Sequence, residues 1–452
     1  MKLRLSINIV LILTLCLSFA YSEQVSVQVE KVADLPVVGG DPGISPQSPR
    51  GGILQMGNDL WFMTNEGGEN SLGAVVSYNL SSKTFSTHHS FGLTDPMNPT
   101  TARYDGNSPW KATLFQDADG RVYYTTQYGG ESNTSQSNGG AVGWFNPATV
   151  AVDGVNVVWS GGTTGTEPRR LINEAVYVNN GTTESLYILT NSGGTNSRGT
   201  VQKAVIDNGS LVSSSQIVDF WGDSPSTRQP QGGMLLVGDK LYYTTGSGAS
   251  GAAISLQSID TVTDTRTVLS TTWSTTRSSG SQTGSYSTPI YDSTRNAIYS
   301  VSLQGGILKW DITTGTQSIL PGSEVDLTGS NFADPILFGE SIYYIKQASS
   351  TTGGQLFRYD LESEELIHLS DLIGYDGYAS SQSGSFSIVM EDGISYLYFL
   401  TNAGGAIPGK NGMGALFRLG ISPIPEPSSF LLLTLVGSAA FACRFVRHRK
   451  NI

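Results

Sequence analysis

Hydrophobic residues along this chain recur as short apolar and aromatic runs that end in Thr or Ser or lead into a turn rich in Gly. The pattern occurs seven times, at residues 60–64, 122–126, 186–190, 241–245, 298–301, 342–345 and 397–401. Glycines follow each run, as Gly67-Gly68 follows Leu60-Trp61-Phe62-Met63-Thr64. Apolar and aromatic runs bounded by Gly are typical of β-strands. The sequence therefore predicts an internal repeat built around seven strands.

Each run is flanked in the same way. An apolar strand and a tight polar turn precede it, as at residues 52–59, 112–120 and 234–239. A strand led by Gly follows it, at residues 73–76, 140–142, 199–201, 251–254, 306–308, 354–358 and 414–418. Most copies add a fourth strand, for example at residues 84–91, 215–220 and 366–372. Because Asp-Gly and similar turns favour hairpins, each copy predicts four antiparallel strands.

Seven such units predict an all-β fold, a seven-bladed β-propeller over residues 23–420. Successive copies begin between 44 residues apart (Ile298 to Ile342) and 64 residues apart (Val122 to Leu186). These spacings are near or above the usual blade length, so some connections must be long. A solenoid and a β-sandwich are the alternatives. A solenoid needs a parallel-strand or helical unit, and a sandwich does not repeat this regularly.

The ends of the repeat array predict how the ring closes. The seventh copy ends near Leu419 without a fourth strand, whereas residues 25–35 offer one whose ending, 31–35, resembles residues 366–372. A ring left open would expose unpaired strand edges, so we expect the N-terminal strand to complete the last blade. Copies four to six fit the repeat least well, because Gly246-Ser247-Gly248 replaces the Gly pair, copy five lacks the polar gap, and Lys346-Gln347 replaces Thr.

The N-terminus has the features of a secretory signal peptide at residues 1–22. Lys2 and Arg4 precede an apolar stretch over residues 9–20, and small and polar residues follow. The stretch is too short for a comfortable membrane span, which needs about 20 apolar residues. We therefore expect cleavage between Ser22 and Glu23, with an uncleaved anchor as the alternative.

The C-terminus, residues 421–452, contains Pro425-Glu426-Pro427, then an apolar stretch over residues 430–443, then a basic end. The cations of that end are Arg444, Arg447, Arg449 and Lys450. A rigid Pro-Glu-Pro, a membrane segment over residues 430–446 and cations that hold the tail on the cytoplasmic side make a stop-transfer anchor. The three elements closely resemble a PEP-CTERM sorting signal.

That resemblance implies processing near Pro-Glu-Pro by an exosortase-type membrane enzyme. The chain would then pass through the inner membrane and reach the cell surface or the extracellular matrix. The alternative is an ordinary single-pass anchor in which Pro-Glu-Pro is only a linker. Separately, the repeat over residues 50–420 resembles the tandem GloVer repeat of exported bacterial proteins, and copies one, three and seven match it best.

The charge balance excludes a basic nucleic-acid binder. The chain has 26 Lys and Arg against 37 Asp and Glu, for a net charge of −11. Its two cysteines, Cys16 and Cys443, both lie in terminal apolar segments, so the body is predicted to have no disulfide and no thiol chemistry. We expect no cofactor.

Three motifs that suggest chemistry have simpler interpretations. Residues 246–251 match GxGxxG, but the pattern predicts a strand after them and not the helix that would hold a pyrophosphate. Residues 117–120 suggest a calcium loop but lack the later ligands, so a hairpin turn is expected. His88, His89 and His368 are expected to be exposed on outermost strands, and neighbouring His88 and His89 would point to opposite faces. We predict no metal site.

The segments that enter the first strands combine Pro with polar or aromatic residues and often a cation, at 48–50, 108–111, 167–170, 228–231, 286–289 and 332–335. In a propeller these segments meet on one face around the central channel. They predict a rim that binds an anionic sugar or polymer, formed by Arg50, Lys111, Arg169, Arg170 and Arg228 with Trp110 as a stacking platform. The alternative is that these cations pair with nearby acids and that Pro only shapes the entry.

The sequence favours a non-enzymatic surface or matrix protein whose propeller binds acidic polysaccharide or another surface protein, in the setting of a biofilm. The sequence contains no Gly-x-Ser-x-Gly elbow and no pair of carboxylates whose spacing indicates a catalytic site. No catalytic residue is therefore predicted. The alternative is an extracellular hydrolase or lyase that acts on glycans. Such an enzyme would assemble its acids from several blades, with two carboxylates about 5 to 10 Å apart.

Overall fold

The computed structural model of the chain describes the residues of the repeat array and leaves out both terminal segments. The described residues are 29–37, 44–92, 104–109, 112, 114–130, 139–149, 152–159, 170–171, 175–220, 230–246, 255–273, 275–276, 282–283, 287–302, 306–324, 334–349, 353–372, 386–401 and 413–421. Among them, no helix has the length and apolar character that crossing a membrane requires. The predicted signal peptide, its cleavage site, the Pro-Glu-Pro motif and the basic tail lie outside these residues.

The chain divides into two compact units. The larger, called here the propeller unit, consists of residues 29–389 and 397–419. The other, called the terminal unit, consists of residues 1–28, 390–396 and 420–452.

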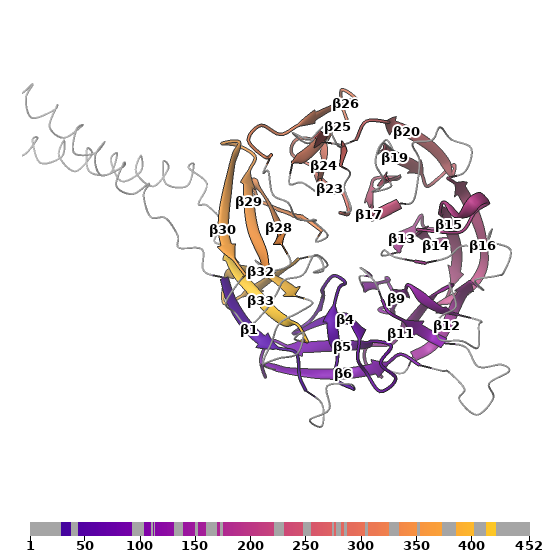
Figure 1. Cartoon of the computed structure of the whole chain (residues 1–452). Helices are drawn as coiled ribbons and strands as arrows, with labels where there is room; N and C mark the ends of the chain where they lie inside the picture. The colour runs from indigo at the N-terminus through magenta and orange to yellow at the C-terminus, as the bar shows by residue number, and fades with distance from the viewer. Residues whose placement is uncertain are drawn as a thin grey trace, which may run out of the picture. The chain divides into compact units, whose positions relative to one another are not determined.

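The propeller unit is a seven-bladed β-propeller of four-stranded antiparallel blades, as predicted (Figure 1). The first three blades, from inner to outer strand, are β2 (Gln47–Pro49) and β3 (Leu54–Met56) with β4 (Asp59–Glu66), β5 (Ala74–Asn79) and β6 (Thr84–Ser90); β8 (Phe115–Gln116), β9 (Val122–Thr126), β11 (Gly140–Phe145) and β12 (Val152–Trp159); and β13 (Val176–Asn179), β14 (Glu184–Thr190), β15 (Thr200–Asp207) and β16 (Ser210–Asp219).

Copies four to six each form a complete four-stranded blade, although their sequences fit the repeat least well. These blades are β17 (Pro230–Val237), β18 (Lys240–Thr245), β19 (Ser255–Asp260) and β20 (Thr265–Ser270); β23 (Ile290–Asp292), β24 (Ala297–Val301), β25 (Ile307–Asp311) and β26 (Thr316–Ile319); and β27 (Ile336–Phe338), β28 (Ser341–Ser349), β29 (Gly353–Asp360) and β30 (Glu365–Asp371). The small additions outside the blades are β7 (Tyr104–Asn107) paired with β10 (Tyr128–Gly130), β21 (Thr275–Thr276) paired with β22 (Gln282–Thr283), and the 3-10 turn Thr195–Ser197.

The seventh blade is made from both ends of the repeat array. Its strands are β31 (Ser387–Glu391), β32 (Ile394–Thr401) and β33 (Ala415–Ile421), and β1 (Val29–Asp34) is its outermost strand. Leu35 N donates to Gly414 O at 3.1 Å, and Leu372 N makes the equivalent bond to Gly354 O at 2.8 Å in the sixth blade. The likeness between residues 31–35 and 366–372 therefore reflects the same place in two blades.

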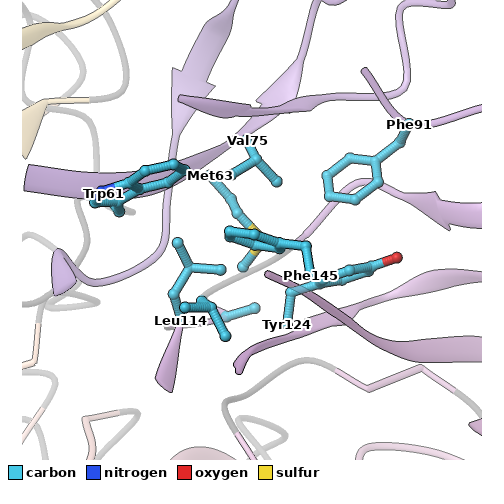
Figure 2. Packing of buried hydrophobic residues seen from close by; sticks show 9 residues of the cluster. Trp61, Met63, Val75, Phe91, Leu114, Tyr124 and Phe145 are labelled. Carbon is cyan, nitrogen blue, oxygen red and sulfur yellow. The ribbon is translucent and has the colours of Figure 1, made fainter. Parts of the chain in front are cut away.

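The hydrophobic core lies between adjacent blades. Figure 2 shows one such layer, with Trp61, Met63 and Val75 of the first blade and Tyr124 of the second labelled. The layer also contains Val122, two residues before Tyr124. Tyr123, the residue between those last two, points the other way and packs in the layer with the third blade. A second strand is thus buried on both faces, which explains why it is a continuous apolar run and not an alternating one.

The connections between strands gather at two ends of the ring. The turn end, as we name it, has the turns between first and second strands and between third and fourth strands. The loop end has the connections between second and third strands and the crossings from each fourth strand to the next blade. The turns at the turn end are short.

Candidate functional site: the loop end of the propeller

Three blades close their second-to-third connection with the same hydrogen bond. In each, the hydroxyl of a buried Thr accepts from the backbone N–H of the residue that follows a Gly. The pairs are Thr64 with Ala74 at 3.1 Å, Thr190 with Thr200 at 3.0 Å, and Thr401 with Ala415 at 3.1 Å. The Thr of the repeat therefore has a structural role: its hydroxyl fixes the start of the third strand.

A side chain at the Gly of this arrangement would clash with the backbone. Gly73, Gly199 and Gly414 have φ values of 99°, 92° and 103°. A Cβ on any of them would lie 2.2 or 2.3 Å from the carbonyl oxygen of the blade's Thr. Beyond this clash, Pro Cδ of the neighbouring blade lies close, at 3.1 Å (Pro109), 3.0 Å (Pro230) and 2.8 Å (Pro49). Thr, Gly and Pro thus lock successive blades together at the loop end.

The residue at the entry to a blade adopts a left-handed backbone in three blades. Ser48, Ser108 and Arg170 have φ values of 54°, 51° and 54°. Their N–H groups donate to the carbonyl oxygens of Met413 at 3.0 Å, Leu72 at 2.9 Å and Gly139 at 3.4 Å, each in the preceding blade. The backbone needed to cross between blades is therefore the same whether the side chain is Ser or Arg.

Arg170 presents a charge at this entry. Its carbonyl oxygen accepts from Asn191 N at 3.1 Å, so its backbone is held on both sides, while its side chain is exposed. Asn191 in turn donates from Nδ2 to Pro230 O at 3.2 Å, which links the entry to the next blade. A left-handed backbone is uncommon for a residue with a long side chain. Arg170 thus combines an exposed, charged side chain with a backbone that hydrogen bonds hold in place.

Arg50 is half-buried and has a different environment. Loss of solvent lowers the pKa of its guanidinium, and the charge of Glu66 opposes that shift. Glu66 ends β4 in the same blade, next to the strand that leads to Arg50. For Arg50, burial therefore outweighs the charge of Glu66 in setting the pKa.

The entry of the third blade differs from the entries of the first two. Leu171 occupies there the place that Pro49 and Pro109 have against the Gly of the preceding blade: its Cδ1 lies 1.9 Å from where a Cβ on Gly140 would be. Arg170 therefore comes directly before the residue at this place, Leu171, whereas Arg50 comes directly after Pro49. The rim as a whole stays a prediction. Trp110, Lys111, Arg169 and Arg228 lie outside the described residues.

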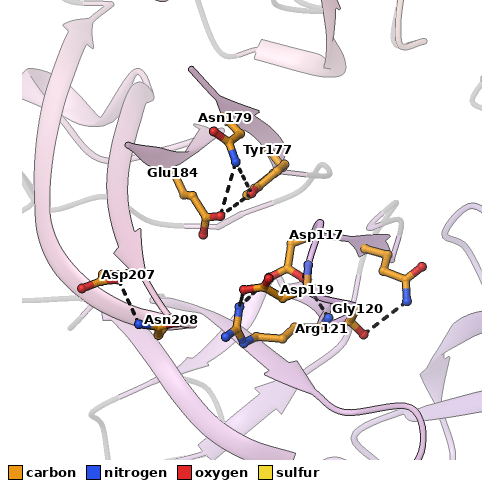
Figure 3. Close-up of polar contacts among 10 residues, drawn as sticks. Asp117, Asp119, Gly120, Arg121, Tyr177, Asn179, Glu184, Asp207 and Asn208 are labelled. Atoms are coloured by element: carbon orange, nitrogen blue, oxygen red, sulfur yellow. Dashed lines mark hydrogen bonds and ion pairs between the residues drawn. The ribbon is translucent and has the colours of Figure 1, made fainter. Parts of the chain in front are cut away.

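The Asp-Ala-Asp-Gly segment is a hairpin turn at the turn end, as expected (Figure 3). Asp117 is buried and its Oδ1 accepts from Asp119 N at 2.9 Å and Arg121 N at 2.8 Å. Arg121 Nη1 contacts Asp117 Oδ2 at 3.1 Å and Asp119 Oδ2 at 2.7 Å. A guanidinium thus occupies the place between the two carboxylates. Strands β18 and β19 flank the GxGxxG segment, so a strand follows it, also as expected.

The three His residues of the body all lie on outermost strands, as predicted. His368 is exposed, whereas His88 and His89 are half-buried, which corrects the expectation that all three are exposed. His88 stacks on Trp61 with 4.2 Å between ring centroids, and its Nε2 lies 2.7 Å from Ser77 Oγ. Burial lowers the pKa of His88, and Asp59 opposes the shift. His88 lies at a register shift, where Val75 pairs with His89 and Val76 with Thr87, and its ring packs on Trp61 of β4. Within the described ranges, no group of three His, Cys, Asp or Glu side chains could hold a metal ion.

Lys346 is a buried charged residue at the loop end that sequence reasoning noted only as a departure from Thr. It lies on β28 and has no exposed surface. The register of β28 with β29 places it opposite Gln355. Its signal in the sequence was the substitution itself, because a Lys where the repeat has a buried Thr must be accommodated inside the fold.

Comparisons with known proteins give no family. No family model matches the chain, and no curated protein matches it. Among solved structures, BamB from Moraxella catarrhalis aligns with a TM-score of 0.46 and 12% identity, covering 87% of this chain and 100% of that one. A PL25 ulvan lyase, a polysaccharide lyase, aligns with a TM-score of 0.46 and 13% identity, covering 85% of this chain and 94% of that one. Neither likeness bears on what this chain binds.

Proposed function

We propose that this chain is an exported, non-enzymatic scaffold that binds acidic polysaccharide at the loop end of its propeller. The observation that carries the proposal is Arg170, an exposed cation whose backbone is fixed by hydrogen bonds from two directions at an inter-blade entry. A cation held in this way loses little backbone freedom on binding, so more of the attraction to an anionic polymer remains as affinity.

The proposed route to the surface rests on the two terminal segments. The signal peptide directs export with cleavage after Ser22, and residues 430–446 hold the precursor in the inner membrane. An exosortase-type enzyme then processes the chain near Pro425-Glu426-Pro427. The PEP-CTERM and GloVer resemblances support this route, and the body it delivers would act in an extracellular matrix such as a biofilm.

The test compares cations at the two ends of the propeller. Co-sedimentation with a polyuronate is measured for the wild type, for Arg170→Asn and for Arg170→Lys. Asn tolerates the left-handed backbone and removes the charge, and Lys retains the charge. Lys240→Ala is the matched control, because Lys240 is exposed at the turn end.

We expect Arg170→Asn to weaken binding severalfold, and Arg170→Lys and Lys240→Ala to leave it nearly unchanged. Binding should also weaken as salt is added, because exposed charges are screened. Equal binding by all variants would contradict the proposed site. Release of new sugar ends in the same tubes would instead identify a glycan-active enzyme and contradict the scaffold.

A further inference from the structure

In the sixth blade a different pair of side chains takes the place of the Thr and of the residue after the Gly. Leu372 N donates to Gly354 O at 2.8 Å, the bond that Phe91 N makes to the Gly of the first blade. Gly354 therefore has the place of that Gly, and Gln355 follows it. Lys346 on β28 lies directly opposite Gln355 on β29, where blades one, three and seven have their Thr. An amine and a carboxamide thus replace a hydroxyl and a short side chain.

The register places the amine of Lys346 within reach of the carboxamide of Gln355. The Cβ atoms of directly opposite residues are about 4.5 to 5.5 Å apart, and the two side chains together are longer than this separation. Lys346 has no exposed surface, so its amine lies inside the protein. Removal from water favours the neutral form of an amine, and the neutral form is the nucleophile.

The carboxamide of Gln355 is held through its nitrogen. Gln355 Nε2 donates to Asp371 Oδ1 at 2.8 Å, and Asp371 lies opposite Gln355 on β30. His368 Nε2 is 3.0 Å from the same carboxylate oxygen. An amine, a carboxamide and a carboxylate therefore form one row across three neighbouring strands.

The oxygen of the same carboxamide is not used. Gln355 Oε1 is buried and has no hydrogen-bond partner among the described residues, although most buried polar atoms have one. A Lys ammonium can donate three hydrogen bonds, so a simple polar pair of Lys346 and Gln355 would use this acceptor. The arrangement is better explained by a reaction between the two side chains than by a hydrogen bond.

We propose that Lys346 and Gln355 form an intramolecular isopeptide bond. Lys346 Nζ attacks Cδ of Gln355, and the carbonyl electron pair moves to Oε1. Asp371 accepts a proton from the attacking nitrogen and passes it to Nε2. The carbonyl forms again, the Cδ–Nε2 bond breaks, and ammonia leaves. One amide replaces another, so the reaction needs no oxidant, reductant or other reactant. Asp371 is exposed, so the ammonia has a path to solvent.

The bond gives the sixth blade a covalent closure at the loop end. It links residues 346 and 355, on either side of the second-to-third connection that a Thr hydroxyl closes in blades one, three and seven. The body of the chain has no cysteine, because Cys16 and Cys443 both lie in the terminal segments. A link between Lys and Gln needs no thiol and is not broken by reduction.

The test is a trypsin digest of the purified full chain, denatured only after purification and analysed by mass spectrometry. Trypsin cleaves after Lys309, Lys346 and Arg358, so an unlinked chain gives the fragments 310–346 and 347–358. Trypsin does not cleave after a Lys whose amine is acylated. We expect a single fragment, 310–358, with a mass lower than that of its sequence by one ammonia. Fragment ions should place the loss within residues 346–355.

Two variants test the roles of the side chains. Gln355→Met has a similar length and no carboxamide, so it should give two separate fragments. Asp371→Asn keeps the shape and removes the group that moves the proton, so most of the chain should stay unlinked. Asp219→Asn is the matched control and should leave the link intact, because Asp219 lies opposite Thr200 at the equivalent place in the third blade. Cleavage after Lys309 shows in every sample that digestion is complete.

The wild type alone can overturn the proposal. Recovery of 310–346 and 347–358 as separate fragments, in the same amount as their neighbours, would do so. A fragment 310–358 without the loss of ammonia would be a missed cleavage and would also contradict the bond. Linkage in Asp371→Asn that equals the wild type would contradict the proton transfer as written.

Discussion

The two ends of the propeller solve the same problem, reversing the chain, in different ways. At the turn end a carboxylate or amide oxygen accepts backbone N–H groups of its own turn: Asn79 Oδ1 from Ser81 and Ser82, and Asp260 Oδ1 from Val262 and Thr263. At the loop end a buried Thr, a left-handed Gly and the Pro of the next blade interlock. The turn end is locally determined, whereas the loop end depends on the neighbouring blade.

At the turn end, a further hydrogen bond joins the two turns of the same blade. In four blades, the residue after the Asn or Asp donates its N–H to a carbonyl of the first-to-second turn. These bonds are Leu80 to Asn58 at 2.9 Å, Thr261 to Asp239 at 2.8 Å, Ile312 to Asn296 at 3.0 Å and Leu361 to Glu340 at 2.7 Å. Such turns can form as soon as one blade forms, and the long connections are left to the opposite end.

The largest expected effect comes from removing the strand that closes the ring. Deleting residues 23–36 removes buried Val29 and Leu35 and leaves β33 with an unpaired edge. We expect the loss of these two side chains alone to cost about 3 to 6 kcal/mol of unfolding free energy, measured by chemical denaturation. Glu30→Gln is the control: it retains the strand, removes an ion pair to Arg418, and should cost about 1 kcal/mol or less. An unchanged denaturation midpoint for the deletion would contradict closure.

The next largest effect is expected for Gly→Ala substitutions, whose cost in stability should differ between the two ends. Gly199→Ala meets a carbonyl oxygen at 2.3 Å in addition to its left-handed backbone, whereas Gly238→Ala at the turn end meets nothing within 4 Å. We expect a cost of about 2 to 5 kcal/mol for Gly199→Ala, because strain and overpacking add. Gly238→Ala should cost only about 1 to 2 kcal/mol. Equal losses in thermal denaturation would mean that the neighbouring blade does not constrain the loop end.

Polar side chains test the same contrast at a smaller scale. Thr190→Val removes the acceptor of the buried Thr200 N–H and should cost about 1 to 3 kcal/mol, while Thr190→Ser should restore most of the stability. Asp260→Ala removes bonds to N–H groups that water can reach, so its cost should be smaller than that of Thr190→Val. A larger loss for Asp260→Ala, measured by urea denaturation, would reverse the contrast.

The smallest expected effect is a dependence on pH. The pKa of His88 is lowered in the folded chain, so the unfolded chain takes up its proton first as the pH falls through about 6.5. The wild type should lose stability from there down to the folded pKa of His88. Hydrogen bonds from Thr263 lower the pKa of Asp260. The turn that contains Asp260 therefore loses stability only in stronger acid, below about pH 4.

Melting temperatures at pH 7.5 and 5.5 separate these two groups. His88→Gln should reduce the difference between the two pH values. Asp260→Asn should leave the difference unchanged, because Asp260 does not titrate in this range. If His88→Gln leaves the difference as large as in the wild type, His88 is not the source of the acid sensitivity.

The sequence by itself determined the blade count, the strand order and the ring closure. These depend on local signals, namely apolar runs, Gly-led strands and the likeness of residues 31–35 to 366–372, which need no partner to be visible. The hairpin at Asp117 was predictable for the same reason. The terminal segments were also interpreted from local composition, and their roles stay predictions.

The tertiary structure decided which residues share a place across blades. Leu171 takes the position of Pro49 and Pro109 because a side chain of suitable shape is all that the Gly of the preceding blade requires. The charge of Glu66 acts on Arg50, and the ring of His88 stacks on Trp61, because antiparallel strands bring residues distant in sequence near one another. Contacts between strands and between blades depend on register and packing, and neither is written in the spacing along one chain.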